Sequence, residues 1–502
     1  MCIPRCSRGL AGESQRAVIK YFALAALLFL AQASLGGATA HFRADPGTFY
    51  GYDLSRLLPS HLARTWHLQL AILLIATAYM AGGLFLAPAL GGREPSRQAR
   101  GVNLLFGALV LVVGGSLLGE HLGLSQRLGK LWFWLGDQGW EYLDLGRVWQ
   151  IALIAGLCLW VILIFRAIAP SRRDPARSEI ASLFVYTAVA IPLFYLPALF
   201  YGPATHFSVV DVWRFWIIHL WVEGFFELFV TAMVAAIFFE LGLVSHVTAR
   251  RVVYLDAILY LGSGIVGTGH HWYWTGQPDV TMALAAMFSA MEVVPLTLLT
   301  LDAGDFVRLG RARCDSCGQS VSVPHRWTFR FLMAVGFWNF VGAGVFGFLI
   351  NLPIVSYYEV GTVLTPNHGH ASMMGVFGML AVALMVFAFR QVLSDADWKP
   401  VEKLVAVAFW GLNIGLALMV VTNLFPVGVL QLRDVLENGY WHARSPAFLD
   451  RPLIRALEWA RLPGDLIFIG LGALPVLAAA LLTVRALRRA PSGGPPVRGW
   501  ME

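Results

Sequence analysis

Apolar residues fall into long runs along most of the chain. Each run holds about 20 residues, the length that an α-helix needs to cross the hydrocarbon core of a bilayer. Because an open sheet cannot exist in lipid, the pattern predicts an all-α, polytopic membrane helix bundle of about twelve helices. The predicted helices lie near residues 19–40, 67–90, 101–118, 148–169, 180–200, 211–241, 252–272, 281–302, 327–350, 368–390, 403–424 and 465–485.

The connections between these runs alternate in character. Basic segments such as GGREPSRQAR and RQVLSDADWKPVEK fall on one side, and aromatic, Gly- and Pro-containing segments on the other, including a long one from Phe425 to Asp465. By the positive-inside rule the basic side is the cytoplasm, so we expect cytoplasmic tails at 1–18 and 489–502 around a membrane domain at 19–488. The first run could instead be a signal peptide, but Gln32 within it and the lack of a cleavage site favour a retained helix.

Composition agrees with a membrane protein. Of 502 residues, 58% are hydrophobic and 13% charged, a balance that leaves too little polar surface to cover a soluble domain. The net charge of +7 lies in short clusters between apolar runs and reports topology, so no nucleic-acid partner is expected. The five cysteines offer no disulfide framework; Cys314 and Cys317 form a single Cys-x-x-Cys that could bind zinc with Cys2 and Cys6 or belong to a variable loop.

Histidines gather at one membrane depth. On the predicted topology six of the thirteen lie in the outer third of the bilayer: His67, His219, His270, His271, His368 and His370. Isolated imidazoles in hydrocarbon are costly, and metal ligation commonly explains such a cluster. A His-x-His pair by itself would be better explained by interfacial hydrogen bonding, so the interpretation depends on the other four histidines.

The spacing suggests two kinds of metal site. His219 and Glu223 are four residues apart and share a helix face, with Glu227 one turn further on. Together with His270 and His271 they make a set of three histidines and one carboxylate, which favours iron(II) over copper.

The His-x-His pair needs two different partners. Residues two apart on a helix differ by about 200°, so His368 and His370 leave opposite sides. We expect His67 and His370 to hold a six-coordinate electron-transfer haem, and His368 a five-coordinate haem that faces the iron.

These motifs resemble a known family. HLWVEGFFE, GTGHHWYW, FSAMEVVP and TPNHGHASMMG are similar to the catalytic subunit of bacterial nitric oxide reductases, in the haem–copper oxidase superfamily. RTWHLQL, LWFWLGDQGWEYLDLGR, FWNFVGAGVFGFLINLPIVSYYE and RLPGD look like its quinol-dependent branch, and the resemblance runs from about Lys20 to about Ala490.

The resemblance implies a subunit I-like fold, a bacterial inner-membrane location and a set of cofactors. They are a low-spin haem b on His67 and His370, a high-spin haem b on His368, and a non-haem iron, whose implied ligands are His219, Glu223, His270 and His271.

Three further residues match family positions. Glu292 corresponds to a glutamate thought to assist proton delivery, and its alternative is a carboxyl bonded between helices. Glu141, with Asp144 close by, corresponds to a calcium site beside the haem propionates, although a solvated loop charge would look the same. Asp465 corresponds to a residue near the quinol pocket, or is a helix N-cap.

The chain also departs from the quinol-dependent pattern. It begins at the first core helix, without the usual N-terminal extension and soluble domain, and it has no Cys-x-x-Cys-His for an attached c-type haem. Electrons could therefore come from membrane quinol directly or through a partner, and the assembly could be a homodimer or a complex with a small accessory subunit.

The expected reaction is reduction of two NO to N2O and water, with Glu223 as ligand and proton relay and Glu227 and Glu292 as supporting carboxylates. Two related enzymes remain alternatives, a nitric oxide dismutase and an oxygen-reducing haem–copper oxidase. An oxidase would carry a tyrosine about one turn from the first metal-site histidine or on a nearby helix, and Glu223 stands at that place. A haem-free transporter with histidine proton relays is the alternative from another class.

Overall fold

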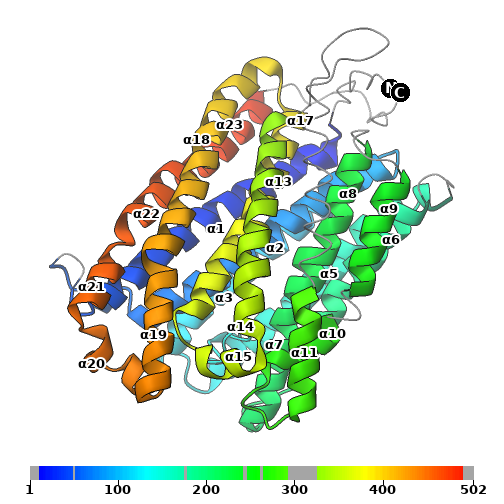
Figure 1. Cartoon of the computed structure of the whole chain (residues 1–502). Coiled ribbons are helices and arrows are strands. Elements are labelled where there is room, and N and C mark those ends of the chain that lie inside the picture. Colours follow the sequence, from blue (N-terminus) through cyan, green and yellow to red (C-terminus); the bar gives the residue numbers. More distant parts are fainter. Residues whose placement is uncertain are drawn as a thin grey trace.

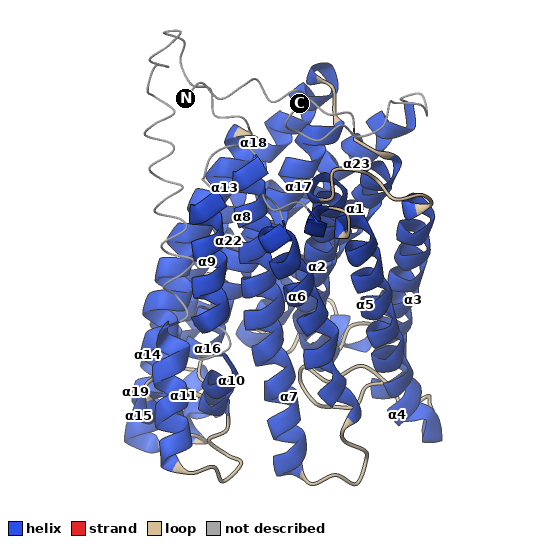
Figure 2. Ribbon diagram, turned by 90° about the vertical axis from the view of Figure 1, so that its right-hand side faces the viewer, coloured by secondary structure: helices blue, strands red, loops and turns tan. Residues whose placement is uncertain are grey.

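A bundle of roughly parallel and antiparallel helices makes up the protein in the computed structural model (Figures 1 and 2). The structure describes residues 11–48, 51–173, 178–240, 246–259, 264–291 and 325–489. Within these ranges every regular element is helical, as the apolar pattern predicts. The prediction of an all-α membrane bundle is therefore confirmed.

The elements follow the predicted runs. The first half holds α1 (Glu13–Ala44), α2 (Ser60–Leu90), α3 (Gln98–Leu124), α4 (Trp132–Leu135), α5 (Arg147–Ile168), α6 (Ser178–Tyr195), α7 (Phe207–Trp221), α8 (Val230–Glu240), α9 (His246–Leu259), α10 (Ile265–Gly267) and α11 (Asp279–Met291). The second half holds α13 (Arg326–Trp338), α14 (Phe348–Asn351), α15 (Pro353–Glu359), α16 (Leu364–Gly369), α17 (Met379–Val392), α18 (Asp395–Met419), α19 (Phe425–Asn438), α20 (Pro446–Leu449), α21 (Pro452–Trp459), α22 (Leu462–Ile467) and α23 (Leu474–Arg489).

Ten helices of the described chain are long and apolar enough to cross a membrane. They match the first six and the last four predicted runs. The seventh run passes through residues 260–263 and the eighth extends beyond Met291, so each lies partly outside the described residues.

Two predicted boundaries are wrong. The segment from Phe425 to Asp465, expected to be a long connection, is largely helical, because α19 continues α18 through a π-helical turn and α20 and α21 follow. The last membrane helix accordingly starts at Pro452, well before Asp465. Polar residues such as Gln431 and Asp434 break the apolar run there, but they are buried against neighbouring segments.

The bundle has two ends. Arg16 near the start of α1 donates a hydrogen bond to the carbonyl of Leu487 near the end of α23 at 3.3 Å, so the two described chain ends meet at one end, the terminal face. The other end, where α11, α15 and α20 lie in Figure 1, is called the distal face below. On the predicted topology the distal face is the outer one.

Three helical segments form the inside of the bundle. In the most apolar window of each, 89% of the residues are buried in Ser60–Leu90, 94% in Phe207–Ile237 and 89% in Leu364–Val392, compared with 33% in Gln98–Leu124. They meet where the Tyr79 hydroxyl donates to the Phe377 carbonyl at 2.9 Å and Phe226 packs on both rings. These three segments carry most of the predicted ligands.

Several π-helical segments interrupt the long helices in the part of the chain that the structure describes. They are η5 (Val222–Phe229), η8 (Asn339–Gly347), η9 (His370–Gly378), η10 (Val420–Leu424) and η12 (Phe468–Ala473). A π turn widens the helix and changes which backbone carbonyls are bonded within it, and such turns occur frequently at functional sites. Glu223 and Glu227 lie in η5, and His370 begins η9.

Candidate metal and haem centre

His67 and His370 face one another across the middle of the bundle. Their ring centres lie 6.1 Å apart and their planes are inclined by 29°. An iron about 2 Å from one nitrogen of each ring would separate the centres by about 6 Å, since each nitrogen lies about 1 Å from its own ring centre. The spacing therefore fits two axial ligands of one iron.

Both rings have their Nδ1 atoms occupied by backbone carbonyls. His67 Nδ1 lies 2.9 Å from the Gln32 carbonyl on α1, and His370 Nδ1 lies 2.7 Å from the Pro366 carbonyl one turn earlier. A ring that donates from Nδ1 keeps its Nε2 lone pair for a metal, and this second bond fixes the ring orientation. The sequence gives no signal for the partnership of Gln32 with His67.

Two glycines lie beside these rings in space or in sequence. A Cβ atom added at Gly36 would lie 2.6 Å from His67 Cε1, so this glycine leaves room for the ring. A Cβ added at Gly369, between His368 and His370, would meet no atom within 4 Å. The helix surface between the two proposed haem ligands is thus uncovered by protein.

Arg461 is a site residue that only the structure reveals. Its Nη2 lies 3.3 Å from His370 Nε2, and its Nε donates to both carboxylate oxygens of Asp465 at 3.0 and 3.1 Å. Asp465 lies within α22, and its own backbone N–H bonds to the Arg461 carbonyl. The N-cap alternative for Asp465 is therefore wrong, and the carboxylate belongs to a buried ion pair beside His370.

His368 points away from this pair. Its Nδ1 lies 2.8 Å from the Gly342 carbonyl in η8. Close crossing of η8 and η9 makes this bond possible, since a Cβ added at Gly342 would lie 2.5 Å from the Ala371 carbonyl carbon. His368 thus shares with the other two the bond from Nδ1 to a backbone carbonyl.

His219, His270 and His271 form the one group of the described chain in which at least three His, Cys, Asp or Glu side chains bring their ligand atoms within 4.8 Å of one another. His270 Nε2 and His271 Nε2 are 2.8 Å apart, and the His219 ring centre lies 5.0 and 5.2 Å from theirs. Converging imidazole nitrogens are the donor set that divalent iron, zinc and copper share.

Glu223 contacts this cluster through one histidine. Its Oε1 lies 2.5 Å from His219 Nε2, but it does not share the 4.8 Å grouping. Glu223 and Glu227 are both buried, at 2% and 8% exposure. Because η5 has π geometry, the two carboxylates are not one regular α-helical turn apart, as the spacing had predicted. The structure thus brings together three predicted histidine ligands with Glu223 beside them.

Glu141 lies on the distal side in the loop before α5. Its carboxylate pairs with Arg64 at 3.0 Å and lies 4.0 Å from an Arg214 nitrogen. These arginines neutralise it in part, and the calcium site expected there stays a prediction.

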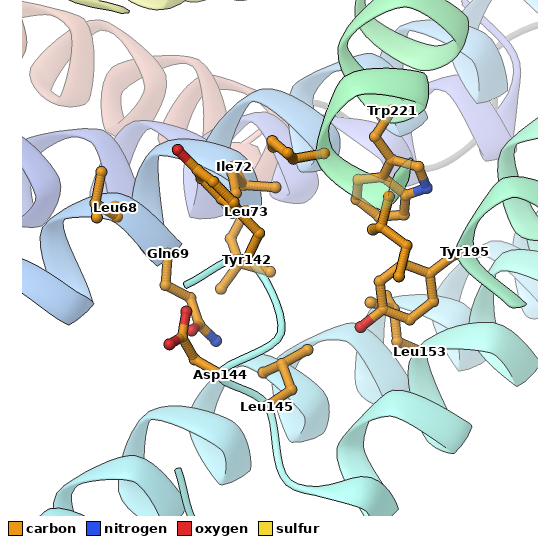
Figure 3. A pocket seen from close by; sticks show the side chains of 12 residues that line it. Leu68, Gln69, Ile72, Leu73, Tyr142, Asp144, Leu145, Leu153, Tyr195 and Trp221 are labelled. Carbon is orange, nitrogen blue, oxygen red and sulfur yellow. The ribbon is translucent and has the colours of Figure 1, made fainter. Parts of the chain in front are cut away.

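Asp144 lines a small pocket with Gln69, Tyr142 and Tyr195 (Figure 3). Burial, with the nearby carboxylates of Asp137 and Glu141, raises the pKa of Asp144 to about 8. The pocket also touches Leu68 and Ile218, the sequence neighbours of His67 and His219.

Five residues of the predicted sites lie outside the described residues. They are Glu292 and the four cysteines of the possible zinc site, Cys2, Cys6, Cys314 and Cys317.

Comparisons with known proteins show the family and the fold of the chain. Residues 16–467 match the family described as cytochrome c and quinol oxidase polypeptide I. The chain is 27% identical over 442 residues to a subunit of the nitric oxide reductase of Stutzerimonas stutzeri, covering 87% of this chain and 86% of the relative. A solved haem–copper terminal oxidase dimer has a similar fold, with a TM-score of 0.64 and 13% identity over 98% of this chain and 88% of that one.

Proposed function

Because the chain belongs to the cytochrome c and quinol oxidase polypeptide I family, and is thus a multi-pass membrane oxidoreductase of the haem–copper oxidase type, we propose that it reduces nitric oxide. The reaction is 2 NO + 2 electrons + 2 protons giving N2O and water. The observation that carries the proposal is Glu223 against His219 in a cluster of three histidines, of which His219 and His270 are buried. A carboxylate beside imidazoles favours iron over copper, and it stands where an oxygen-reducing relative would carry a tyrosine.

The geometry of the ligands supports a proposed set of cofactors. His67 and His370 would hold a low-spin haem b, His368 a high-spin haem b, and His219, His270, His271 and Glu223 a non-haem iron. When bound, the haems and the iron would carry electrons and bind NO, chemistry that no side chain of this cluster supplies alone. Three Nδ1 atoms held by backbone carbonyls and the uncovered surface at Gly369 support this assignment.

The chain's own side chains would orient the reactants and move protons. All the proposed ligands except His270 and His271 lie on the three most buried segments. Because burial keeps water away from the site, electrostatic interactions within it are stronger. Glu223 would exchange a proton beside His219, with Glu227 and Glu292 as the carboxylates that supply it.

The electron donor is proposed to be membrane quinol, with Asp465 near its binding pocket. The Arg461–Asp465 pair supports a role at this place, because it lies against His370, the proposed ligand of the electron-transfer haem. The proposed location is a bacterial cytoplasmic membrane, with both chain termini in the cytoplasm. The proposed assembly is a homodimer or a complex with a small accessory subunit. A calcium ion is proposed at Glu141.

One experiment tests the proposed reaction. The purified chain is supplied anaerobically with NO and either quinol or reduced cytochrome c, and N2O, N2 and O2 are measured together. Consumption of NO with one N2O formed per two NO supports the proposal and names the donor. Formation of N2 and O2 would assign a dismutase, and turnover of O2 without NO reduction would assign an oxidase.

A further inference from the structure

Glu359 at the end of α15 is a buried carboxyl that the proposed reaction does not yet use. It is 1% exposed and lies on the distal face. Its Oε1 accepts a hydrogen bond from the Thr365 hydroxyl at 2.7 Å, and Thr365 lies three residues before His368 on α16. Residues three apart share a helix face, so the carboxyl is one side chain away from the proposed ligand of the high-spin haem.

α15 also contacts a residue close to the other half of the metal site. Ser356, one turn before Glu359, hydrogen-bonds with Tyr273, two residues after His271. Ser356 and Glu359 lie on one face of α15. α15 therefore carries two polar groups, Ser356 and Glu359. With their hydrogen-bond partners they form a cluster that we call the distal cap (Tyr273, Ser356, Glu359 and Thr365), whose outer members lie close in sequence to His271 and His368.

The turn after Glu359 is held firmly in place. Gly361 adopts φ +80°, which glycine tolerates and which turns the chain back into α16. Arg444 donates to the Val360 carbonyl at 3.2 Å, and the Val363 N–H donates to Gln431 Oε1 at 2.9 Å. The carboxyl is thus pre-positioned by backbone contacts, and an amide of the same shape can replace it.

The charged and titratable groups around this turn are phenols, one arginine and one imidazole. Tyr357, Tyr358, Tyr440 and Tyr273 are phenols, and Arg444 keeps its charge. His442, the nearby imidazole, is paired with Asp434 at 2.6 Å. Burial raises the pKa of Glu359 to about 7, with the Thr365 hydroxyl acting in the opposite direction.

We propose that Glu359 is a proton-relay residue, which takes up a proton from the distal face and passes it through the distal cap to the metal site. This inference rests on the proposed function. In each cycle the Glu359 carboxyl loses one proton and becomes a carboxylate. That proton, with an electron from an external reductant such as dithionite or quinol, is consumed in forming N2O and water, and solvent at the distal face then protonates the carboxylate again.

The variants Glu359→Gln, Thr365→Val and Glu437→Gln test it on the purified full chain. Glu437 is an exposed glutamate on the same face, paired with Arg433, and its variant is the matched control. With dithionite as reductant, wild-type NO consumption should fall as the pH rises through about 7, since the protonated form is the donor. Glu359→Gln should lower the rate at least about tenfold and remove the pH dependence, without changing the haem spectrum.

Thr365→Val distinguishes a relay from a structural role. It removes the hydrogen bond that stabilises the carboxylate, so the inflection should move to higher pH. Wild-type rate and pH profile in Glu359→Gln would overturn the proposal.

A second measurement does not depend on NO turnover. Infrared difference spectra between oxidised and dithionite-reduced protein should contain a carboxyl C=O band that titrates near neutrality and is absent in Glu359→Gln. If the wild type consumed no NO, the proposed function would fail, but this band would still support Glu359 as a proton store coupled to the centre. A spectrum identical in wild type and Glu359→Gln would overturn that role.

Discussion

The centres of the imidazole rings of His67 and His370 lie 6.1 Å apart, although the two residues are 303 positions apart in the chain. Their helices are joined at mid-depth by the hydrogen bond from Tyr79 to the Phe377 carbonyl. The distance between the two rings is thus set by the packing of two of the most buried segments.

Replacing either ring should remove one haem. His67→Ala or His370→Ala should leave about half of the wild-type haem b, with the remaining haem spectrum high-spin. Reduced-minus-oxidised spectra and total haem content check this. His61→Ala, at an exposed histidine on the same helix, is the control and should keep both haems. Unchanged haem content in both His67 and His370 variants would contradict the assignment.

Loss of His219 should affect the other metal. His219→Ala removes one of three converging nitrogens and the partner of Glu223, so bound non-haem iron should fall while both haems remain. NO reduction should decrease more than about 100-fold, because even outer contacts of a metal site cost about 10- to 100-fold. Elemental analysis alongside the haem spectrum measures both effects. A variant with full NO turnover would refute the site.

Two adjacent glycines offer a matched test of the low-spin pocket. A Cβ at Gly36 would lie 2.6 Å from His67 Cε1, whereas a Cβ at Gly37 would meet Ile469 at an ordinary 3.5 Å. Gly36→Ala should therefore displace the His67 ring and change the low-spin haem spectrum and midpoint potential. Gly37→Ala should change neither. Redox titration followed by absorbance is the measurement, and equal behaviour of the two variants would argue against ligation by His67.

The buried pair of Arg461 and Asp465 should be costly to break singly. Removing one partner leaves the other charge buried, which typically costs about 3–5 kcal/mol. We expect Arg461→Leu and Asp465→Leu each to lower the unfolding temperature clearly, and the double variant to recover part of the loss. Thermal unfolding in detergent checks it. If Asp465 also contacts quinol, Asp465→Asn should raise the KM for quinol, and the KM for NO should stay the same.

Asp144 should make the protein less stable as the pH rises. Its folded pKa of about 8 lies above the ordinary value of 3.8, so folding favours the protonated carboxyl. The contribution of the Asp144 carboxyl to the free energy of unfolding is then fully present below about pH 4 and is lost progressively towards pH 8. Asp144→Asn should remove this loss and raise the unfolding temperature at pH 8 more than at pH 4. Asp450→Asn, at an exposed carboxylate paired with Arg455, should have little effect at either pH.

The apolar pattern predicted most of the fold. Helices that cross lipid need about 20 apolar residues each, which is a local property, so the runs could be found without knowing their neighbours. The pattern failed from Phe425 to Asp465, where helices carry buried polar residues such as Gln431 and Asp434. Burial there depends on partners such as Ala443 and Arg451, which periodicity does not reveal.

The candidate site was predicted in its residue types but not in its contacts. The spacing of His368 and His370 required two partners, and the common depth of six histidines indicated which ones were available. Gln32, Gly342 and Arg461 were not predicted, because a backbone carbonyl or an arginine next to a turn has no distinctive sequence pattern. The π-helical segments were also missed, since they change the helical register that the spacing assumes.

The sequence by itself determined that this is a membrane helix bundle with imidazoles and carboxylates at one depth. Hydrophobic length and residue type act locally, and they are readable one segment at a time. Only the tertiary structure decided that His67 meets His370, that Glu223 lies against His219, and that Thr365 bonds to Glu359. These contacts come from close packing of the most buried segments and of the distal turns, where backbone approaches of a few ångströms select each partner.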